Sequence, residues 1–569
     1  MRRLFYIFVA LLIACPAWGA NYFVSQSGAG AGTGADVDNA ATVATFNAGT
    51  APFNSLAGNT VYFLDTITTT INPPGSGAVG NNAILRGDYT DHACTFDGGG
   101  TVDYGIEISA DDYFTITGLT FTDTKTAAVN STTGSEGVTV TANTFNMSAG
   151  SGIITKSNWT ISNNTFNQVG SAQMIYTLIG ASGGTVSITG NTFNYTGGTN
   201  IIYIRGYGTH NITDNTFSIT GGTIASLLSD FGSASESGAV TFTGNIVTSL
   251  VGFSSAAIIF KYGYFNPSIS NNIITLTSAT NAKPVISMVD QNSPSIFNNT
   301  LAITKATSAI SLTSTGSASG VSTVSGNNIT MGYTAGYAIA VGSENTSASD
   351  YSLNGAIINS NHIYGADKSG TTHGIFVGFN INATIYHNTV SNNGYGVVVK
   401  AAGATYTSGM VAYNTFSDCG IGVRIKGVNN VPIYNNTIAN STQALFISEN
   451  TTGTLSTGTI IKNNLLYEGT LITVLDTSTI AANNSDYNLL YTSGSYVSYQ
   501  AASKNYSEWQ AMGYDANSVN SDPLFISSTN FHLQSGSPAR GAGVNVGLIH
   551  LDPPDIGAEP YLQYVPWKH

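Results

Sequence analysis

The chain has 569 residues, a formal net charge of −13 and only 8% charged residues. An average globular domain carries about 25% charged residues, and exposed helix faces are normally built from Glu, Lys and Arg, so a largely helical protein is excluded. The 17 Lys and Arg residues leave no basic surface for binding nucleic acid. With 42% hydrophobic residues and 64 Gly, the chain is predicted to be ordered and all-β.

Residues 1–19 are predicted to be a signal peptide. Two arginines precede an apolar run from Leu4 to Ala14, and the small residues Ala17 and Gly19 fit a cleavage site. The run is shorter than the roughly 18 residues of a membrane span. We therefore expect a secreted protein, extracellular or on the cell surface of a bacterium, with no membrane span; a lipid anchor on Cys15 is an alternative use of the same stretch.

Residues 20–100 are predicted to form an N-terminal cap and the first coils of a repeat array. An open parallel edge invites aggregation and needs a cover. The stretch Asp38–Phe46 is expected to form a short helix over the first coil.

Residues 101–490 carry one repeated phrase, in which alternating apolar residues are followed by Asn, any residue and an apolar residue. Steps between neighbouring copies run from 21 to 34 residues, as in a solenoid. Each unit is predicted to hold three short strands, and such coils stack about 4.8 Å apart. The repeated Asn would lie at a tight bend, where its backbone tolerates the left-handed region. It would form a ladder of Asn143, Asn164, Asn191, Asn215, Asn245, Asn272, Asn299, Asn327, Asn361, Asn388, Asn414, Asn436 and Asn464.

The predicted fold is therefore a right-handed parallel β-helix of about 13 or more coils, with short capping segments at both ends. Cys94 and Cys419 lie 325 positions apart, many coils from one another, and are expected to be buried free thiols. The chain is expected to be a monomer.

Residues 491–569 are predicted to close the array. A short helix is expected over Tyr506–Met512, and the Pro- and Asp-rich segment from Ser521 to Tyr561 is expected to wrap the end.

Several of these segments resemble the secreted bacterial right-handed parallel β-helix proteins of the pectate-lyase-like superfamily. The resemblance is carried by Asn21–Ser25 with Gly58–Phe63, by the Asn-Thr-Phe coils, and by a closing pattern of Glu508–Gln510, Gly513–Ser518, Asp522–Phe525, Phe531–Leu533, Gly536–Ala539 and Asp555–Ala558. It implies a polysaccharide partner, but members include lyases, glycosidases, epimerases and proteins without an assigned reaction. Similar lyases often hold Ca²⁺ through outward Asp or Glu; this sequence shows no such cluster, so no metal ligands are assigned, and whether the protein uses Ca²⁺ stays open.

A group of cations stands out in this lysine-poor chain. Alternation places Lys400 outside the helix, with Val398 outside and Val397 and Val399 inside. Lys426 lies 26 residues later, the same step as from Asn388 to Asn414, so the two lysines are predicted to be neighbours on adjacent coils. Arg424 shares their face.

This cationic group would suit cleavage of an acidic glycan. Two neighbouring ammonium groups repel, which favours a neutral lysine able to act as a general base, and Arg424 would stabilise the developing enolate. Phe376 and Phe446 flank the column of Arg424, and His373 and His387 lie in the same coils, as candidates for binding sugar; His387 occupies the slot of Tyr413, so packing explains it equally.

Three functions remain open from the residues. The first is a lyase on an acidic, uronate-containing glycan. The second is a non-catalytic, adhesive β-helix that binds glycan, in which the three cations only solvate one sheet. The third is a glycoside hydrolase, for which Asp367 and Asp418 are available without a spacing that proves a pair.

Overall fold

A computed structural model describes residues 19–558, apart from 110, 132, 157, 171, 181–182, 223, 231–236, 262–263, 315–319, 343–354, 379–382, 402–408, 451–452, 476–477, 481–482 and 549–552. All but the last residue of the predicted signal peptide, including Cys15, falls outside the described residues, as do residues 343–354 of the longest repeat step. In the described part, no helix is long and apolar enough to cross a membrane.

The chain divides into two compact units, residues 1–167 and 168–569, and each is a parallel β-helix. In each unit, short strands stack in register into three sheets, here called A, B and C. With about 14 turns and almost no helix, the structure confirms the predicted right-handed parallel β-helix.

The first unit opens with the cap. Strand β1 (Asn21–Ser25) pairs in parallel with β3 (Thr60–Phe63). Helix α1 (Val43–Asn47) buries Val43 and Phe46. It begins later than predicted because Thr42 accepts a hydrogen bond from the Thr45 N–H at 3.0 Å and caps the helix there. Part of the expected helix is instead the 3₁₀ turn Val37–Asn39 and the short strand β2 (Ala41–Thr42).

The coils of the first unit follow the cap. Sheet A continues with β5 (Ala83–Arg86), β10 (Phe114–Thr117), β13 (Val138–Thr141) and β16 (Trp159–Ser162). Sheet B includes β8 (Thr95–Asp97), β11 (Thr120–Thr122) and β14 (Thr144–Met147). Sheet C includes β9 (Tyr104–Ile108), β12 (Ala127–Ser131) and β15 (Ser151–Thr155).

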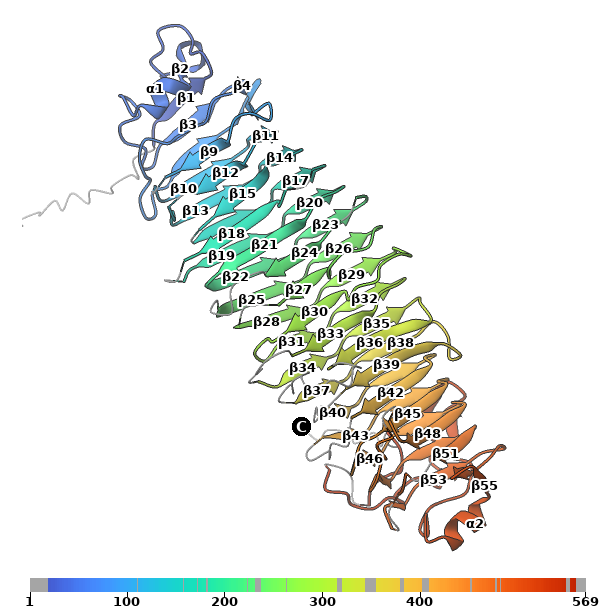
Figure 1. The fold of residues 1–569 in the computed structure, drawn as a ribbon. Coiled ribbons are helices and arrows are strands. Elements are labelled where there is room, and N and C mark those ends of the chain that lie inside the picture. Colours follow the sequence, from blue (N-terminus) through green and yellow to red (C-terminus); the bar gives the residue numbers. More distant parts are fainter. Residues whose placement is uncertain are drawn as a thin grey trace, which may run out of the picture. The chain divides into compact units, whose positions relative to one another are not determined.

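In the second unit the same three sheets run from green to red in Figure 1. Sheet A runs from β19 (Thr185–Thr189) to β52 (Ser485–Asp486), sheet B from β20 (Thr192–Tyr195) to β53 (Leu489–Tyr491), and sheet C from β18 (Ile175–Ile179) to β54 (Val497–Tyr499). Inward columns of Ile, Val, Leu and Phe fill the interior; in sheet C, for example, Ile375, Val397, Val423 and Leu445 align and are buried.

The predicted Asn ladder is present in both units at the corner between sheets A and B. Asn388 is representative: its side-chain amide donates to the Asn414 side chain at 2.9 Å and to the Ile358 carbonyl of the preceding coil at 2.8 Å. The structure corrects one detail, because the left-handed residue is the one before the Asn, such as His387 at φ 54° and Tyr413 at φ 53°. The Asn side chain then satisfies the carbonyls that this bend leaves unpaired.

The ladder extends one member beyond the prediction and ends on a carboxylate. Asn488 continues it, and its amide donates to Asp515 at 2.8 Å. The buried Asp515 also accepts hydrogen bonds from Ser485, Ser518 and Trp509. A side chain that only accepts is a chemically fitting end for a row of amides that donate toward it.

The C-terminal elements close the second unit. Helix α2 (Tyr506–Ala511) confirms the predicted helix, with an Asn505–Glu508 capping box and a buried Trp509. It follows β55 (Ala502–Lys504), which pairs antiparallel with β54. Beyond it, β56 (Phe525–Ser527) and β57 (Asn530–Leu533) form a hairpin.

The described part of the closing segment packs against the outer face of sheet B, a position that the sequence did not indicate. Leu533, Ala539 and Ile556 form a buried cluster with Leu465 and Leu489 of sheet B. The Ala558 N–H donates to the Thr437 hydroxyl at 3.0 Å. The last coils of sheet B are thereby covered, and the coils before them are not.

Candidate functional site

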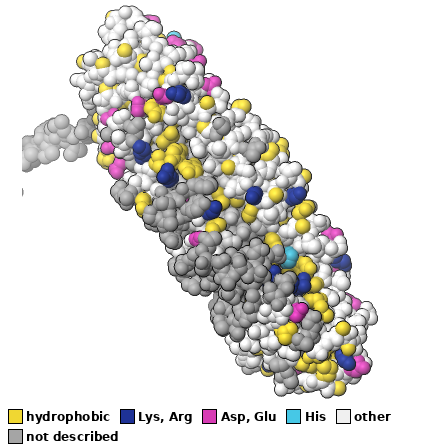
Figure 2. Space-filling view, viewed as in Figure 1, with side chains coloured by type: hydrophobic (Ala, Val, Ile, Leu, Met, Phe, Trp, Pro, Cys, Tyr) yellow, Lys and Arg dark blue, Asp and Glu magenta, His cyan; other side chains and the backbone are white. Residues whose placement is uncertain are grey.

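The outer face of sheet C brings the three predicted cations together. Five of its strands matter here: β36 (Ala335–Val341), β39 (Thr371–Val377), β42 (Tyr395–Lys400), β45 (Ile421–Lys426) and β48 (Gln443–Ser448). Lys400 lies directly opposite Lys426 in the register, and Ser448 follows Lys426. We call Lys400, Arg424 and Lys426, with the rings of Tyr395 and Phe446, the cationic face. Figure 2 shows basic side chains beside hydrophobic ones and a histidine over these strands.

Arg424 is held between two aromatic rings. Its guanidinium carbon lies 5.5 Å from the centre of the Tyr395 ring and 5.1 Å from that of Phe446, both within cation–π range. One terminal nitrogen donates to the Tyr395 hydroxyl at 3.3 Å. Its Nε is buried and has no hydrogen-bond partner among the described residues. The buried Nε is out of a ligand's reach, but the remaining terminal N–H groups of this partly exposed side chain can donate to an anionic ligand.

An aromatic ladder lies beside the cations. Tyr337, His373 and Tyr395 are register partners on successive coils. The His373 ring stacks on Tyr395 at 4.5 Å and lies 4.8 Å from Tyr337. His373 therefore belongs to the face that carries Arg424, and it positions the Tyr395 ring on which the guanidinium rests.

Two outward positions are more buried than expected. Val398 is 3% exposed although alternation places it outside, and Phe376, in the same column, is 1% exposed. The reason is the column itself, because Val398 lies between the larger Phe376 and Arg424. Phe376 packs against Tyr337 and His373 and so supports the face from below, whereas Phe446 contacts Arg424 directly.

His387 does not join this face. It lies at the corner between sheets A and B, where its ring stacks on Tyr413 at 5.2 Å. This is the packing arrangement that the shared slot with Tyr413 indicated.

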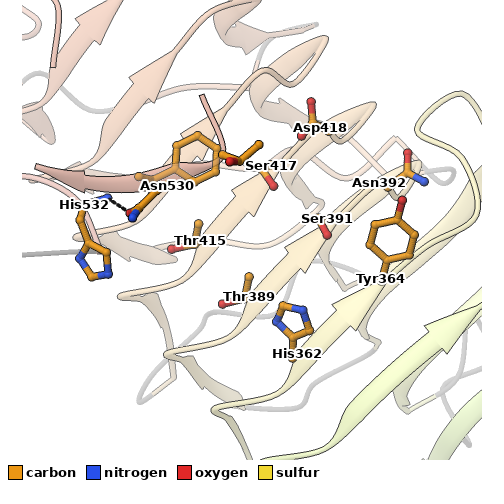
Figure 3. A pocket seen from close by; sticks show the side chains of 12 residues that line it. His362, Tyr364, Thr389, Ser391, Asn392, Thr415, Ser417, Asp418, Asn530 and His532 are labelled. Carbon is orange, nitrogen blue, oxygen red and sulfur yellow. Dashed lines mark hydrogen bonds between the residues drawn. The ribbon is translucent and has the colours of Figure 1, made fainter. Parts of the chain in front are cut away.

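A second hollow lies on the outer face of sheet B, next to the C-terminal hairpin. Its floor comes from β38 (His362–Tyr364), β41 (Thr389–Ser391) and β44 (Thr415–Ser417), and its wall from Thr529–His532 of the hairpin. Asn392 and Asp418 complete the lining (Figure 3). The cavity measures about 650 Å³. We call it the sheet B groove.

Sequence reasoning named Asp418 but missed the groove. In the two coils that follow β38, the same outward columns carry Thr and Ser, so His362 and Tyr364 are the larger side chains of the floor. Asp367, the other carboxylate considered for hydrolysis, does not line the groove; its carboxylate accepts hydrogen bonds from Ser369, which lower the pKa of Asp367.

The described residues contain no group of three His, Cys, Asp or Glu placed to hold a metal ion. Neither the cationic face nor the sheet B groove offers the donor set of a metal centre, so no step below is routed through one.

The chain was compared with protein families, curated sequences and solved structures. The family model described as periplasmic copper-binding protein (NosD) matches residues 339–470, the coils that carry the cationic face and the floor of the sheet B groove. No curated protein sequence matches the chain.

Similar solved structures include a pectate lyase, Pel9A (12% identity, 95% of this chain and 96% of that chain, TM-score 0.24), and a mannuronic acid specific polysaccharide family 6 lyase from human gut microbiota (13% identity, 89% and 92%, TM-score 0.28). A third is XylC in complex with xylose (10% identity, 79% and 69%, TM-score 0.20). The three stacked parallel sheets themselves confirm the parallel β-helix fold that the sequence resemblance implied.

Proposed function

We propose that this protein acts on polysaccharide, and that it is a lyase which binds and cleaves an acidic, uronate-containing glycan on the cationic face. One observation carries the proposal. Arg424 is fixed between Tyr395 and Phe446 with a buried, unpartnered Nε, beside a register pair of lysines. In a chain of net charge −13, three cations on one sheet face form a local positive site. Such a site attracts carboxylates, and the neighbouring rings suit the apolar faces of sugars.

Each group has a role in a β-elimination. Arg424 pairs with the uronate carboxylate and stabilises the negative charge that develops there. A neutral lysine, Lys400 or Lys426, removes the proton on C5. The electron pair forms the C4–C5 double bond, the C4–O bond breaks, and the leaving oxygen takes up a proton.

The test is an absorbance assay for the unsaturated uronate product on a panel of acidic polysaccharides. Lys400→Arg and Lys426→Arg keep the positive charge but remove the amine that could accept a proton, because arginine stays protonated. They therefore distinguish a role in binding from a role as the base. Replacing the base should lower kcat about 10²- to 10⁴-fold while binding persists. Arg424→Ala should weaken binding and lower kcat. Lys462→Ala, the same charge change on strand β49 (Ile460–Lys462) of sheet A, is the matched control and should leave activity unchanged.

Three outcomes would contradict the proposal. Product formation that survives all three substitutions would remove the cationic face as the site of cleavage. Binding of acidic glycan that depends on the cationic face, without any unsaturated product, would establish the adhesive alternative instead. Release of reducing ends without an absorbance change would indicate hydrolysis.

A further inference from the structure

We propose that the sheet B groove is a second carbohydrate site, separate from the cationic face, and that it binds neutral oligosaccharide. The two sites lie on different sheets of the same coils, and they differ in chemistry. The cationic face carries three basic side chains, whereas no Lys or Arg is among the described residues that line the groove.

The floor of the groove is a regular polar lattice. His362, Thr389 and Thr415 are register partners in one outward column. Tyr364, Ser391 and Ser417 are partners in the other. Adjacent coils lie about 4.8 Å apart, so hydroxyl groups repeat at that interval along the groove. Hydroxyls both donate and accept hydrogen bonds, which matches the hydroxyl groups of a sugar chain laid along the coils.

The groove ends where the closing segment begins. The next coil offers Thr437 and Ala439 in the same two columns, but these are 1% and 0% exposed. The Thr437 hydroxyl is taken by the Ala558 N–H. On the opposite side, Asn328 precedes His362 in its column and is exposed. A chain molecule can therefore extend along sheet B away from the C-terminus, and it meets a wall in the other direction.

The hairpin wall is firmly attached. Leu533, in β57, belongs to the buried cluster with Leu465 and Leu489, and the Phe525 and Phe531 rings meet edge to face at 5.1 Å. The Gln534 side chain donates to the Phe525 carbonyl at 2.7 Å. A preformed wall lowers the entropic cost of binding, and a cavity of about 650 Å³ is within the usual size range of ligand pockets.

Tyr364 and Asp418 decide the ligand class. Tyr364 is 49% exposed on the groove floor, where it offers a rigid, amphipathic ring surface for a sugar face. Asp418 is the carboxylate in the lining; it can accept hydrogen bonds from sugar hydroxyls, and it repels a uronate. Rows of hydroxyls, an exposed ring and a carboxylate together favour an uncharged oligosaccharide over an acidic one.

The test is calorimetric titration of the full chain with neutral β-1,4-linked gluco-, xylo- and manno-oligosaccharides, with an oligouronate for comparison. Tyr364→Ala should weaken binding of the neutral ligand at least tenfold. Thr389→Ala should weaken it severalfold. Thr216→Ala is the matched control, since Thr216 is exposed in the same column five coils before His362 and lies beyond the reach of a short oligosaccharide in the groove. It should leave affinity unchanged.

Arg424→Ala separates this proposal from the first. Neutral binding should persist in that variant while processing of acidic glycan is lost. The proposal is overturned if no neutral oligosaccharide binds, if Tyr364→Ala and Thr389→Ala bind as the unsubstituted chain does, or if Arg424→Ala abolishes neutral binding. A circular dichroism spectrum like that of the unsubstituted chain shows that each variant is folded.

Discussion

His210 shows how a single position inside a coil can make stability depend on pH. It lies in an inward column of sheet A between Val186 and Val240, fully buried, and its Nε2 lies 3.0 Å from the Thr177 hydroxyl. Burial lowers the pKa of His210 to about 3, whereas a histidine in an unfolded chain has a pKa of about 6.5. The folded coil therefore excludes a proton that the unfolded chain accepts.

We predict that His210 makes the second unit less stable in acid. Between these two pKa values the unfolded state binds more protons, so the free energy of unfolding falls as pH falls. From about pH 7 to pH 5 the loss amounts to roughly 2 kcal/mol. His210→Val, which copies its column neighbours, should remove this part of the slope in urea titrations. The exposed His362, replaced by Val, is the control and should leave the slope unchanged. An equal slope in His210→Val would contradict the assignment.

At the same scale, Arg424 depends on its neighbours in the column. Val398, its neighbour in the column, could not orient the plane of the guanidinium. The coils on either side supply the Tyr395 and Phe446 rings, which do. Its place in the register, and not its charge alone, makes it a candidate for binding a carboxylate.

At the scale of elements, the closing segment determines both the stability of the last coils and the end of the sheet B groove. Outward Leu465 and Leu489 would be an exposed apolar patch without it, since both are fully buried under Leu533, Ala539 and Ile556. The segment thus replaces the polar outer face that other coils have with an apolar contact.

We predict that Ile556→Ala destabilises this contact by about 2–5 kcal/mol, because it removes a fully buried side chain and leaves a cavity. Ile526→Ala is the matched control. Ile526 belongs to the same closing segment, in strand β56, but it is 56% exposed, so its replacement should change the free energy of unfolding little. Limited proteolysis measures the effect, with faster cleavage after residue 520 expected for Ile556→Ala. Equal cleavage rates for the two variants would contradict this account of the contact.

At the scale of the whole molecule, the described residues of each unit contain one buried thiol. Cys94 lies in the first unit and Cys419 in the second, and both are free, as predicted. Burial raises the pKa of each thiol to about 12. Since the thiolate is the reactive form, both should resist modification in the folded protein at neutral pH.

The two thiols should therefore report the unfolding of the two units separately. We predict that, in a chain whose Cys15 is replaced by Ser, Cys419→Ser leaves a thiol whose labelling follows the first unit, and Cys94→Ser leaves one that follows the second. Each should become reactive only over the denaturant range in which its unit unfolds. Because the folded pKa is raised, stability should also fall as pH rises above about 8.5, the value for an exposed thiol. Rapid labelling of either variant in native buffer would show that its coil is open.

The sequence alone determined the features that repeat. The Asn step predicted the ladder and the stacking, and the equal steps from Asn388 to Asn414 and from Lys400 to Lys426 predicted that the two lysines are partners. Such contacts join neighbouring coils, so one period specifies them all. The alternation rule gave the direction of Val398 but not its burial, because burial depends on the size of Phe376 and Arg424 above and below it.

The tertiary structure alone decided where the closing segment lies, and with it the sheet B groove. Ala558 contacts Thr437 across 121 positions, a contact that no repeat period encodes. The physical reason is that backbone hydrogen bonds to the next coil determine how coils stack, whereas the position of the closing segment depends on which apolar surface its side chains pack against. That choice depends on the finished shape of the coils, which exists only after they have stacked.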